Sequence, residues 1–257
     1  MSFRELHERE QLFVMPNPWD VGSARLLASL GFEALATTSA GFAWSIGKAD
    51  QTVTRDELVA HVAALAAATP LPLNVDSERG FPDDPGGVAE TVALLAEAGA
   101  AGFSIEDYDP AADRIDDVEV AAERVRVAAE AADGLVLTGR AENHLHRVDD
   151  LDDTIARLLA YRDAGADVVY APGLADLEQI AAVVEAVGVP VNVLALPHGP
   201  STSELASVGV RRVSTGGALA RSAYGALLSA AQELRERGTS CYAEQGASRD
   251  ALHAAFS

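Results

Sequence analysis

The chain has 257 residues, of which 49% are hydrophobic and 23% are charged, a balance typical of a folded globular protein and not of a disordered one. The 39 acidic residues outnumber the 19 basic ones, and the formal charge of −20 argues against nucleic acids and anionic membranes as partners. The single cysteine, Cys241, excludes an internal disulfide and a thiolate metal cluster, as expected for a protein of the reducing cytoplasm.

The start of the chain, MSFRELHEREQ, is charged and lacks an apolar signal core. No apolar stretch approaches the roughly 18 residues that span a bilayer, so we expect a cytoplasmic protein. The length suits one large domain, because α/β barrels of this size do not need to split. We therefore expect residues 1–257 to form a single domain, with residues 218–257 as a C-terminal helical region.

Short apolar runs alternate with helical patterns along the chain, and this alternation is the main fold signal. The predicted strands are 12–16, 34–38, 71–76, 102–107, 135–141, 167–173, 190–195 and 211–217. Several of the helical segments between them end in glycine, which favours a helix end before a strand. Strands that are apolar throughout are typical of a parallel sheet covered by helices. The pattern predicts an α/β fold, a (β/α)8 TIM barrel, with an open doubly wound sheet as the alternative.

A long helical segment follows the last predicted strand, and it leads to a final segment in which Leu252, Ala255 and Phe256 lie at helical spacing. We expect this segment to form an additional C-terminal helix. Its apolar face can pack either on the barrel or on a neighbouring subunit, and the second arrangement would make the protein a homo-oligomer.

Polar residues collect where the predicted strands end, which is the side of such a barrel that carries the active site. Asp76 and Glu78 end the third strand region in LPLNVDSERGF, and Glu106 ends the fourth in GFSIED. Strand alternation would point Asp76 and Glu78 to one face, and neighbouring strands lie about 4.8 Å apart. Carboxylates this close need either a shared proton or a cation. An oxygen-only set suits Mg²⁺ or Mn²⁺, and the alternative is that these acids pair with arginines or helix N-termini.

Other candidates lie in the same loops. Arg140 in LTGRAENH can grip a substrate carboxylate in a bidentate fork or form an ion pair with a nearby glutamate. Asp50 is not needed as a helix cap, because Thr54 and Glu57 form a capping box for the next helix. His198 in LALPHG can act as an acid or base near neutral pH, although a loop histidine is more often a surface residue.

As a set, these stretches resemble the isocitrate lyase/phosphoenolpyruvate mutase superfamily, in its phosphoenolpyruvate mutase-like branch. The resemblance covers roughly residues 10–235 and rests on NPWDVGSARLLASLGFEALATTSAGFA, KADQT, VDSERGF, GFSIED, GRAENH, NVLALPHGPS and GVRRVSTGG. It implies a barrel in which Asp76, Glu78 and Glu106 hold Mg²⁺ directly or through water. Members of this superfamily commonly form tetramers in which the eighth helix packs on a partner subunit, so a homotetramer with a swapped helix is implied, with a dimer as the smaller alternative.

The resemblance also implies roles for the substrate-facing residues. Thr38, Ser39 and Ala40 would bind a 2-oxo acid, with Arg140 on its carboxylate, and Asp50 matches the aspartate of the catalytic loop of the family. Two residues in the matching stretches, Trp19 and Asn192, are further substrate-binding candidates. Trp19 in MPNPWD can alternatively shape the first turn of the barrel.

Departures from the family pattern bear on the reaction. Isocitrate and methylisocitrate lyases carry a Lys-Lys-Cys-Gly-His segment, and phosphonomutases place lysine, asparagine and serine in a comparable lid. Here the sequence after Glu106 reads DYDPAADRIDD, with neither lysine nor cysteine. Glu78 stands where many members have aspartate.

We expect an Mg²⁺-dependent lyase that cleaves a C–C bond in a small 2-oxo or 2-hydroxy carboxylic acid through an enolate, like an oxaloacetate decarboxylase or an acylpyruvate or malate lyase. Decarboxylation needs no thiol base, so it is compatible with the missing cysteine. Asp50, Arg140 and His198 are the catalytic candidates. One alternative is P–C bond chemistry on phosphonopyruvate or phosphoenolpyruvate, by a mutase or hydrolase, although Lys48 is the only lysine that could assist Arg140. The other alternative is a non-catalytic protein that binds oxo acids.

Overall fold

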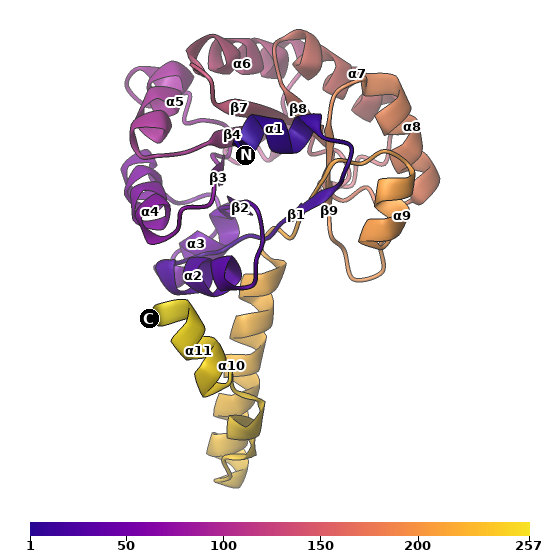
Figure 1. Cartoon of the computed structure of the whole chain (residues 1–257). Helices are drawn as coiled ribbons and strands as arrows, with labels where there is room; N and C mark the ends of the chain where they lie inside the picture. Colours follow the sequence, from indigo (N-terminus) through magenta and orange to yellow (C-terminus); the bar gives the residue numbers. More distant parts are fainter.

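A computed structural model describes residues 1–257, and its centre is a barrel of eight short parallel strands (Figure 1). The strands are β1 (Phe13–Met15), β2 (Leu35–Ala36), β3 (Leu73–Asp76), β4 (Gly102–Glu106), β7 (Val136–Arg140), β8 (Val168–Tyr170), β9 (Val191–Leu194) and β10 (Arg212–Ser214). They pair in the order β1-β10-β9-β8-β7-β4-β3-β2. The N–H of Ala36 donates to the carbonyl of Pro16 at 3.1 Å, so one hydrogen bond links the two edge strands and nearly closes the barrel. The barrel prediction is confirmed, and the open-sheet alternative is wrong.

Helices surround the strands. They are α2 (Val21–Ser29), α3 (Ser39–Ser45), α4 (Arg55–Ala68), α5 (Gly87–Glu97), α6 (Val118–Ala131), α7 (Leu151–Asp163), α8 (Leu177–Val187) and α9 (Thr202–Ser207). The predicted capping box of α4 is present, because Thr54 accepts from the N–H of Glu57 and Glu57 accepts from the N–H of Thr54. The short helix α1 (Phe3–Glu8) packs Phe3 and Leu6 against Phe13 and Val136, at the end of the barrel where the strands begin.

The third strand ends at Asp76, as predicted, and Glu78 lies beyond it. Residue 78 lies in a turn with a φ of 51°, a left-handed conformation that costs energy for a residue other than glycine. This turn directs the carbonyl of Glu78 to the N–H of Glu106 at 2.9 Å and so joins the ends of β3 and β4. The expectation that Asp76 and Glu78 share one face of a strand is therefore wrong, because the chain leaves the sheet after Asp76.

The inside of the barrel is unusually polar. Barrels of this type commonly fill their interior with branched apolar side chains. Here the strands bury hydrogen-bonding side chains instead, namely Asn74, Ser104, Thr138, Asn192, Arg212 and Ser214. The apolar core lies between the strands and the surrounding helices. The inside of the barrel therefore offers hydrogen-bonding side chains next to the site at the carboxyl ends of the strands.

The C-terminal segment does not add a further helix to the ring around the barrel. Helix α10 (Ala218–Arg237) extends away from the barrel, and a 3-10 helix (Cys241–Gln245) leads to α11 (Arg249–Phe256), which returns beside it toward α2 (Figure 1). Ala220 is the only buried residue of α10. A two-stranded hairpin, β5 (Tyr108–Asp109) with β6 (Arg114–Ile115), follows β4. None of the helices combines the length and apolar character needed to cross a membrane.

Candidate active site

Two adjoining cavities open at the carboxyl ends of the strands. The inner cavity has a volume of about 60 Å³ and lies inside the barrel, between Asp76 and Arg140 at the mouth and Arg212 deeper down. The outer cavity has a volume of about 820 Å³ and is lined by Asp50, by residues of α3 and by the loops that follow β9 and β10. Gly216 lines both cavities, so they adjoin at this residue.

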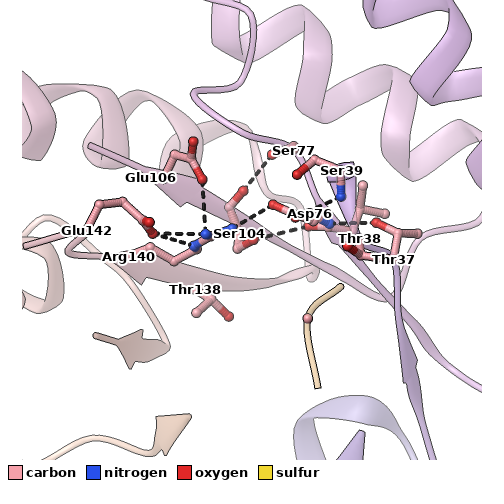
Figure 2. A network of polar contacts seen from close by, with 12 residues as sticks. Thr37, Thr38, Ser39, Asp76, Ser77, Ser104, Glu106, Thr138, Arg140 and Glu142 are labelled. Atoms are coloured by element: carbon pink, nitrogen blue, oxygen red, sulfur yellow. Dashed lines mark hydrogen bonds and ion pairs between the residues drawn. The ribbon is translucent and has the colours of Figure 1, made fainter. Parts of the chain in front are cut away.

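Arg140 is the centre of the polar contacts at the mouth (Figure 2). Its Nη1 donates to Asp76 Oδ1 at 2.6 Å, and its Nη2 lies 3.1 Å from Glu106 Oε2 and 2.9 Å from Glu142 Oε1. The guanidinium also lies over the ring of Tyr170, 5.5 Å from its centroid. One cation therefore faces three carboxylates, and the predicted ion pair between Arg140 and a neighbouring glutamate is present.

Strand order explains why these side chains meet. Glu106 and Arg140 are paired residues at the ends of β4 and β7, and Asp76 ends the next strand, β3. Asp76 is held from the other side, because its carboxylate Oδ2 accepts from the N–H of Ser39 at 3.0 Å (Figure 2). Its own N–H donates to Thr37 Oγ1 at 2.8 Å. The segment between β2 and α3 thus orients Asp76 toward Arg140.

We call Asp50, Asp76, Glu78, Glu106 and Glu142 the acid cluster. Burial raises the pKa of Glu78 to about 8, and the charges of Asp76 and Asp50 add to this effect. Burial likewise raises the pKa of Glu142 to about 7 and that of Glu106 well above its usual value, against the lowering effect of Arg140. Asp50 lies at the outer cavity. Desolvation by the surrounding protein raises its pKa, and the charge of Asp76 adds to this effect. The cluster therefore holds more carboxylates than Arg140 can neutralise, and a second cation would stabilise their ionised forms.

The acid cluster does not form a ready-made metal cage, because no three acidic, histidine or cysteine side chains converge on one point. Arg140 lies among the carboxylates that would have to approach one another. The chemistry of the ligand atoms nevertheless fits a hard divalent cation, since all of them are carboxylate oxygens, and burial raises the pKa of Glu78, Glu106 and Glu142. The buried Oε1 of Gln51 has no hydrogen-bond partner, while its amide nitrogen donates to Glu106 at 2.9 Å. The predicted metal ligands are therefore still Asp76, Glu78 and Glu106.

Four of the predicted substrate-binding residues lie at the site. Ser39 contacts Asp76, and Ala40 lines the outer cavity. Thr38 is buried and caps α3, because its Oγ1 accepts from the N–H of Gly41. Asn192 lines the inner cavity from β9.

Two predicted residues are not brought to the cavities. His198 is exposed in the loop after β9 and lines neither cavity. Trp19 lies against Gly41 at the start of α3, where a Cβ on Gly41 would come within 3.0 Å of the Trp19 Cβ. This position favours the alternative that Trp19 shapes the first turn of the barrel.

Tyr170 and Arg212 also line the inner cavity, although neither was predicted as a site residue. Tyr170 lies in the apolar strand region DVVYAPG, and Arg212 lies in RRVSTGG, which was predicted as a strand without a role for its side chains. The available signal was strand alternation: of two consecutive arginines in a strand, one must point into the barrel. Asn17 is a structural link, because its Oδ1 accepts from the N–H groups of Thr215 and Gly216 and its Nδ2 donates to the carbonyl of Thr37.

The chain is similar to known proteins over most of its length. Residues 3–235 match the family model of phosphoenolpyruvate phosphomutase. An uncharacterised protein of Mycobacterium tuberculosis is 37% identical over 220 residues, which cover 84% of this chain and 82% of that protein. An oxaloacetate decarboxylase of Paraburkholderia xenovorans is 32% identical over 208 residues, which cover 76% of this chain and 68% of the decarboxylase. A crystal structure from Burkholderia cenocepacia, described as a lyase/mutase, is 53% identical with a TM-score of 0.92, over 98% of this chain and 93% of that one.

Proposed function

The chain belongs to the phosphoenolpyruvate phosphomutase family, within the superfamily expected from its motifs, and we propose that it is an Mg²⁺-dependent carbon–carbon lyase. Its substrate is a small 2-oxo or 2-hydroxy carboxylic acid, and the reaction passes through an enolate. The observation that carries this proposal is the acid cluster around Arg140, at the entrance of a cavity of about 60 Å³. The 32% identity to an oxaloacetate decarboxylase supports the cleavage of a C–C bond.

The metal would be held by Asp76, Glu78 and Glu106, directly or through water. When bound, Mg²⁺ supplies positive charge to the acid cluster and polarises the C2 oxygen of the acid. Ser39 and Thr37 keep Asp76 in place through their hydrogen bonds, so the cluster does not have to reorganise during the reaction.

The residues of the chain have distinct tasks when the bond beyond C3 breaks. In a 2-oxo acid, the electron pair of that bond moves into a C2–C3 double bond, and negative charge develops on the C2 oxygen. Arg140 supplies N–H donors and positive charge at the mouth, where this charge develops. The ring of Tyr170 faces this guanidinium and adds a cation–π contact. Asp50 lines the outer cavity, and its raised pKa suits it to hold a proton for return to C3.

Decarboxylation fits this set of residues better than P–C bond chemistry. A leaving carboxylate departs as neutral CO₂ and needs no thiol base. A phosphoryl group would need further positive charge, and the only lysine, Lys48, is engaged with Glu57 at 2.5 Å. The segment after β4 contributes no lysine to the site.

The assay that tests the proposal measures pyruvate release from oxaloacetate, release of the 2-oxo acid fragment from C4 and C5 2-hydroxy acids, and phosphate release from phosphonopyruvate. We expect Mg²⁺-dependent pyruvate release that EDTA stops and that Asp76→Ala abolishes. Asp83→Ala removes an exposed acid outside the site and should leave the rate unchanged.

Full activity in EDTA would contradict the role of the metal. Phosphate release without C–C cleavage would establish the P–C alternative. Stabilisation of the fold by oxo acids without any turnover across the panel would establish the binding-protein alternative.

A further inference from the structure

The loop that carries Asp50 is not held by its backbone. We call residues 46–54, between α3 and α4, the Asp50 loop. Residues 49–52 of this loop make no hydrogen bond between backbone groups. The hydroxyl of Thr52 donates to the carbonyl of Ala49 at 2.7 Å, and this bond stays within the loop. The place of Asp50 at the outer cavity therefore depends on side-chain contacts.

Gln51 makes such a contact with the end of β4. Its Nε2 donates to Oε1 of Glu106 at 2.9 Å. The other oxygen of this carboxylate, Oε2, lies 3.1 Å from Nη2 of Arg140, as Figure 2 shows. Glu106 therefore connects the Asp50 loop on one side with Arg140 on the other.

The backbone of Gln51 acts on Asp50 as well. Its N–H donates to Oδ1 of Asp50 at 3.1 Å, and its φ is 62°, a left-handed conformation that costs energy for a residue other than glycine. Such strain persists where the surrounding structure fixes the residue, and it is common at functional sites. A hydrogen bond from the side chain of Ser39 also holds Asp50 and lowers its pKa, against the effect of burial. Gln51 thus orients the Asp50 carboxylate with its backbone and fastens the loop with its side chain.

The side-chain oxygen of Gln51 shows how firmly the loop is held. This Oε1 is buried and has no hydrogen-bond partner, which costs free energy. Rotation of the amide would not relieve the cost, because it would place the oxygen against the Glu106 carboxylate. The unpaired oxygen and the left-handed backbone both disfavour the observed loop position. The bond from Gln51 to Glu106 offsets them, and its loss would release the loop.

We propose that Gln51 is the positioning residue of the Asp50 loop and that it sets the placement of Asp50 relative to Arg140 by binding Glu106. This inference rests on the proposed function, in which Asp50 holds the proton for C3 and Arg140 stabilises the charge on the C2 oxygen. It deepens that function by naming the residue that keeps the two groups in register. A displacement of about 1 Å between reacting groups can cost about 100-fold in rate.

Kinetics of Gln51→Asn test the positioning role. Asparagine tolerates the left-handed backbone but is too short to reach Glu106. We expect kcat to fall by about 10- to 100-fold, because Asp50 is no longer held in place for proton transfer. KM should stay close to the wild-type value, since Arg140 keeps its contacts with Asp76 and Glu142. Gln51→Gly removes the side chain without backbone strain and should show the same separation of kcat from KM.

Proteolysis of the full chain tests the loop without relying on turnover. Lys48 is the only lysine, so a lysine-specific protease cuts the chain only within the Asp50 loop. We expect Gln51→Asn to be cut at least about 10-fold faster than the wild type, because a hydrogen bond to a charged group no longer holds the loop and cleavage follows the open fraction. Denaturant unfolding of the same variants separates a released loop from a less stable fold.

Thr52→Val provides the control in the same loop. It breaks the hydrogen bond to Ala49, which does not reach the acid cluster, and it should keep the wild-type kcat. An equal loss of kcat in Thr52→Val and Gln51→Asn would overturn the inference, because any disturbance of the loop would then have the same effect as loss of the bond to Glu106.

Two further results would overturn the inference. One is a wild-type rate of cleavage at Lys48 in both Gln51 variants, and the other is a wild-type kcat in both. These outcomes are separable from a failure of the proposed function. Faster cleavage in the variants of a protein that turns over no acid would reject the lyase reaction and support the contact that holds the loop. Mg²⁺-dependent turnover with unchanged kcat and cleavage in the variants would reject only the role of Gln51.

Discussion

At the scale of single residues, Arg140 determines the state of the site. Its guanidinium is 13% exposed and contacts Asp76, Glu106 and Glu142, which are themselves partly or fully buried. Buried ion pairs contribute little net stability, but loss of one partner leaves the other charges uncompensated. Arg140 is therefore needed both to fold the mouth of the barrel and to stabilise charge that develops there.

Replacement of Arg140 by methionine should lower the free energy of unfolding by about 3 kcal/mol, because three buried carboxylates lose their common cation. It should also lower kcat/KM for the cleaved acid by at least about 100-fold. Denaturant unfolding and steady-state kinetics measure the two effects. As a control, Arg126→Met removes an exposed arginine of α6 that pairs with Glu123 and Glu130, and it should change neither quantity measurably. An unfolding midpoint equal to that of the wild type in Arg140→Met would contradict this account.

His7 should make the protein sensitive to mild acid. Burial, with Arg212 nearby, lowers its pKa from 6.5 to about 3, so the unfolded state binds the extra proton between these values. The stabilisation is fully present above pH 6.5 and is lost progressively as the pH falls toward 3. At pH 5 the loss reaches about 2 kcal/mol, from 1.36 kcal/mol per pH unit.

The measurement compares denaturant unfolding between pH 7 and pH 5 for the wild type and His7→Gln. The variant cannot take up this proton, so its stability should fall less steeply over that interval. An equal slope in the two proteins would show that His7 does not carry the effect.

The sequence allowed some of the site to be predicted and not the rest. Asp76, Glu106 and Arg140 follow from the rule that strand ends carry the site, and the structure brings them into contact. Arg212, which lines the inner cavity, could not be predicted from the same rule, because it begins β10 instead of ending it. His198 was chosen for its chemistry, but a loop after β9 leaves it exposed and away from both cavities.

At the scale of elements, the eight strands were predicted from apolar runs, and each observed strand falls within its predicted range. The end of the third strand at Asp76 was predicted, but the expectation that Glu78 shares its face was wrong, because a polar residue can continue a strand or start a turn with little difference in pattern. The hairpin of β5 and β6 was also not predicted, since strands of two residues have no detectable alternation. The conformation of such a turn depends on hydrogen bonds between residues far apart in the sequence. An example is the bond from the N–H of Glu106 to the carbonyl of Glu78.

Helix ends that require glycine should respond to substitution in a specific way. Gly188 ends α8 with a φ of 67°, in open space where a Cβ meets nothing within 4 Å. Gly188→Ala should cost about 1 kcal/mol, because only the left-handed backbone opposes the new side chain. Gly188→Asn should cost less, since asparagine tolerates this conformation. Equal stability of the alanine variant and the wild type in denaturant unfolding would contradict the assignment.

At the scale of the whole molecule, the barrel is continuous and α10 departs from it (Figure 1). Leu227 and Leu228 of α10 are 62% and 63% exposed, and Leu234 in the same helix is 52% exposed. Adjacent exposed leucines on an extended helix favour a contact with another surface. Together with the helix exchange implied by the family resemblance, this supports a homo-oligomer in which α10 packs on a partner subunit.

Light scattering coupled to size-exclusion chromatography tests this arrangement. The wild-type chain should elute as a dimer or tetramer, and the double variant Leu227→Asp with Leu228→Asp should shift toward the monomer, because charged residues do not pack in an apolar interface. Val120→Asp changes an exposed apolar residue of α6 and should leave the assembly intact. A monomeric wild-type protein would contradict the proposed oligomer.

The central role proposed for the acid cluster is to bind a divalent cation. Titration of the full chain with Mn²⁺, followed by electron paramagnetic resonance, measures this directly. We expect one tightly bound Mn²⁺ per chain that Mg²⁺ displaces, and loss of this site in Asp76→Ala but not in the exposed control Asp83→Ala. Absence of bound Mn²⁺ in the wild type, or equal binding in Asp76→Ala, would contradict the account.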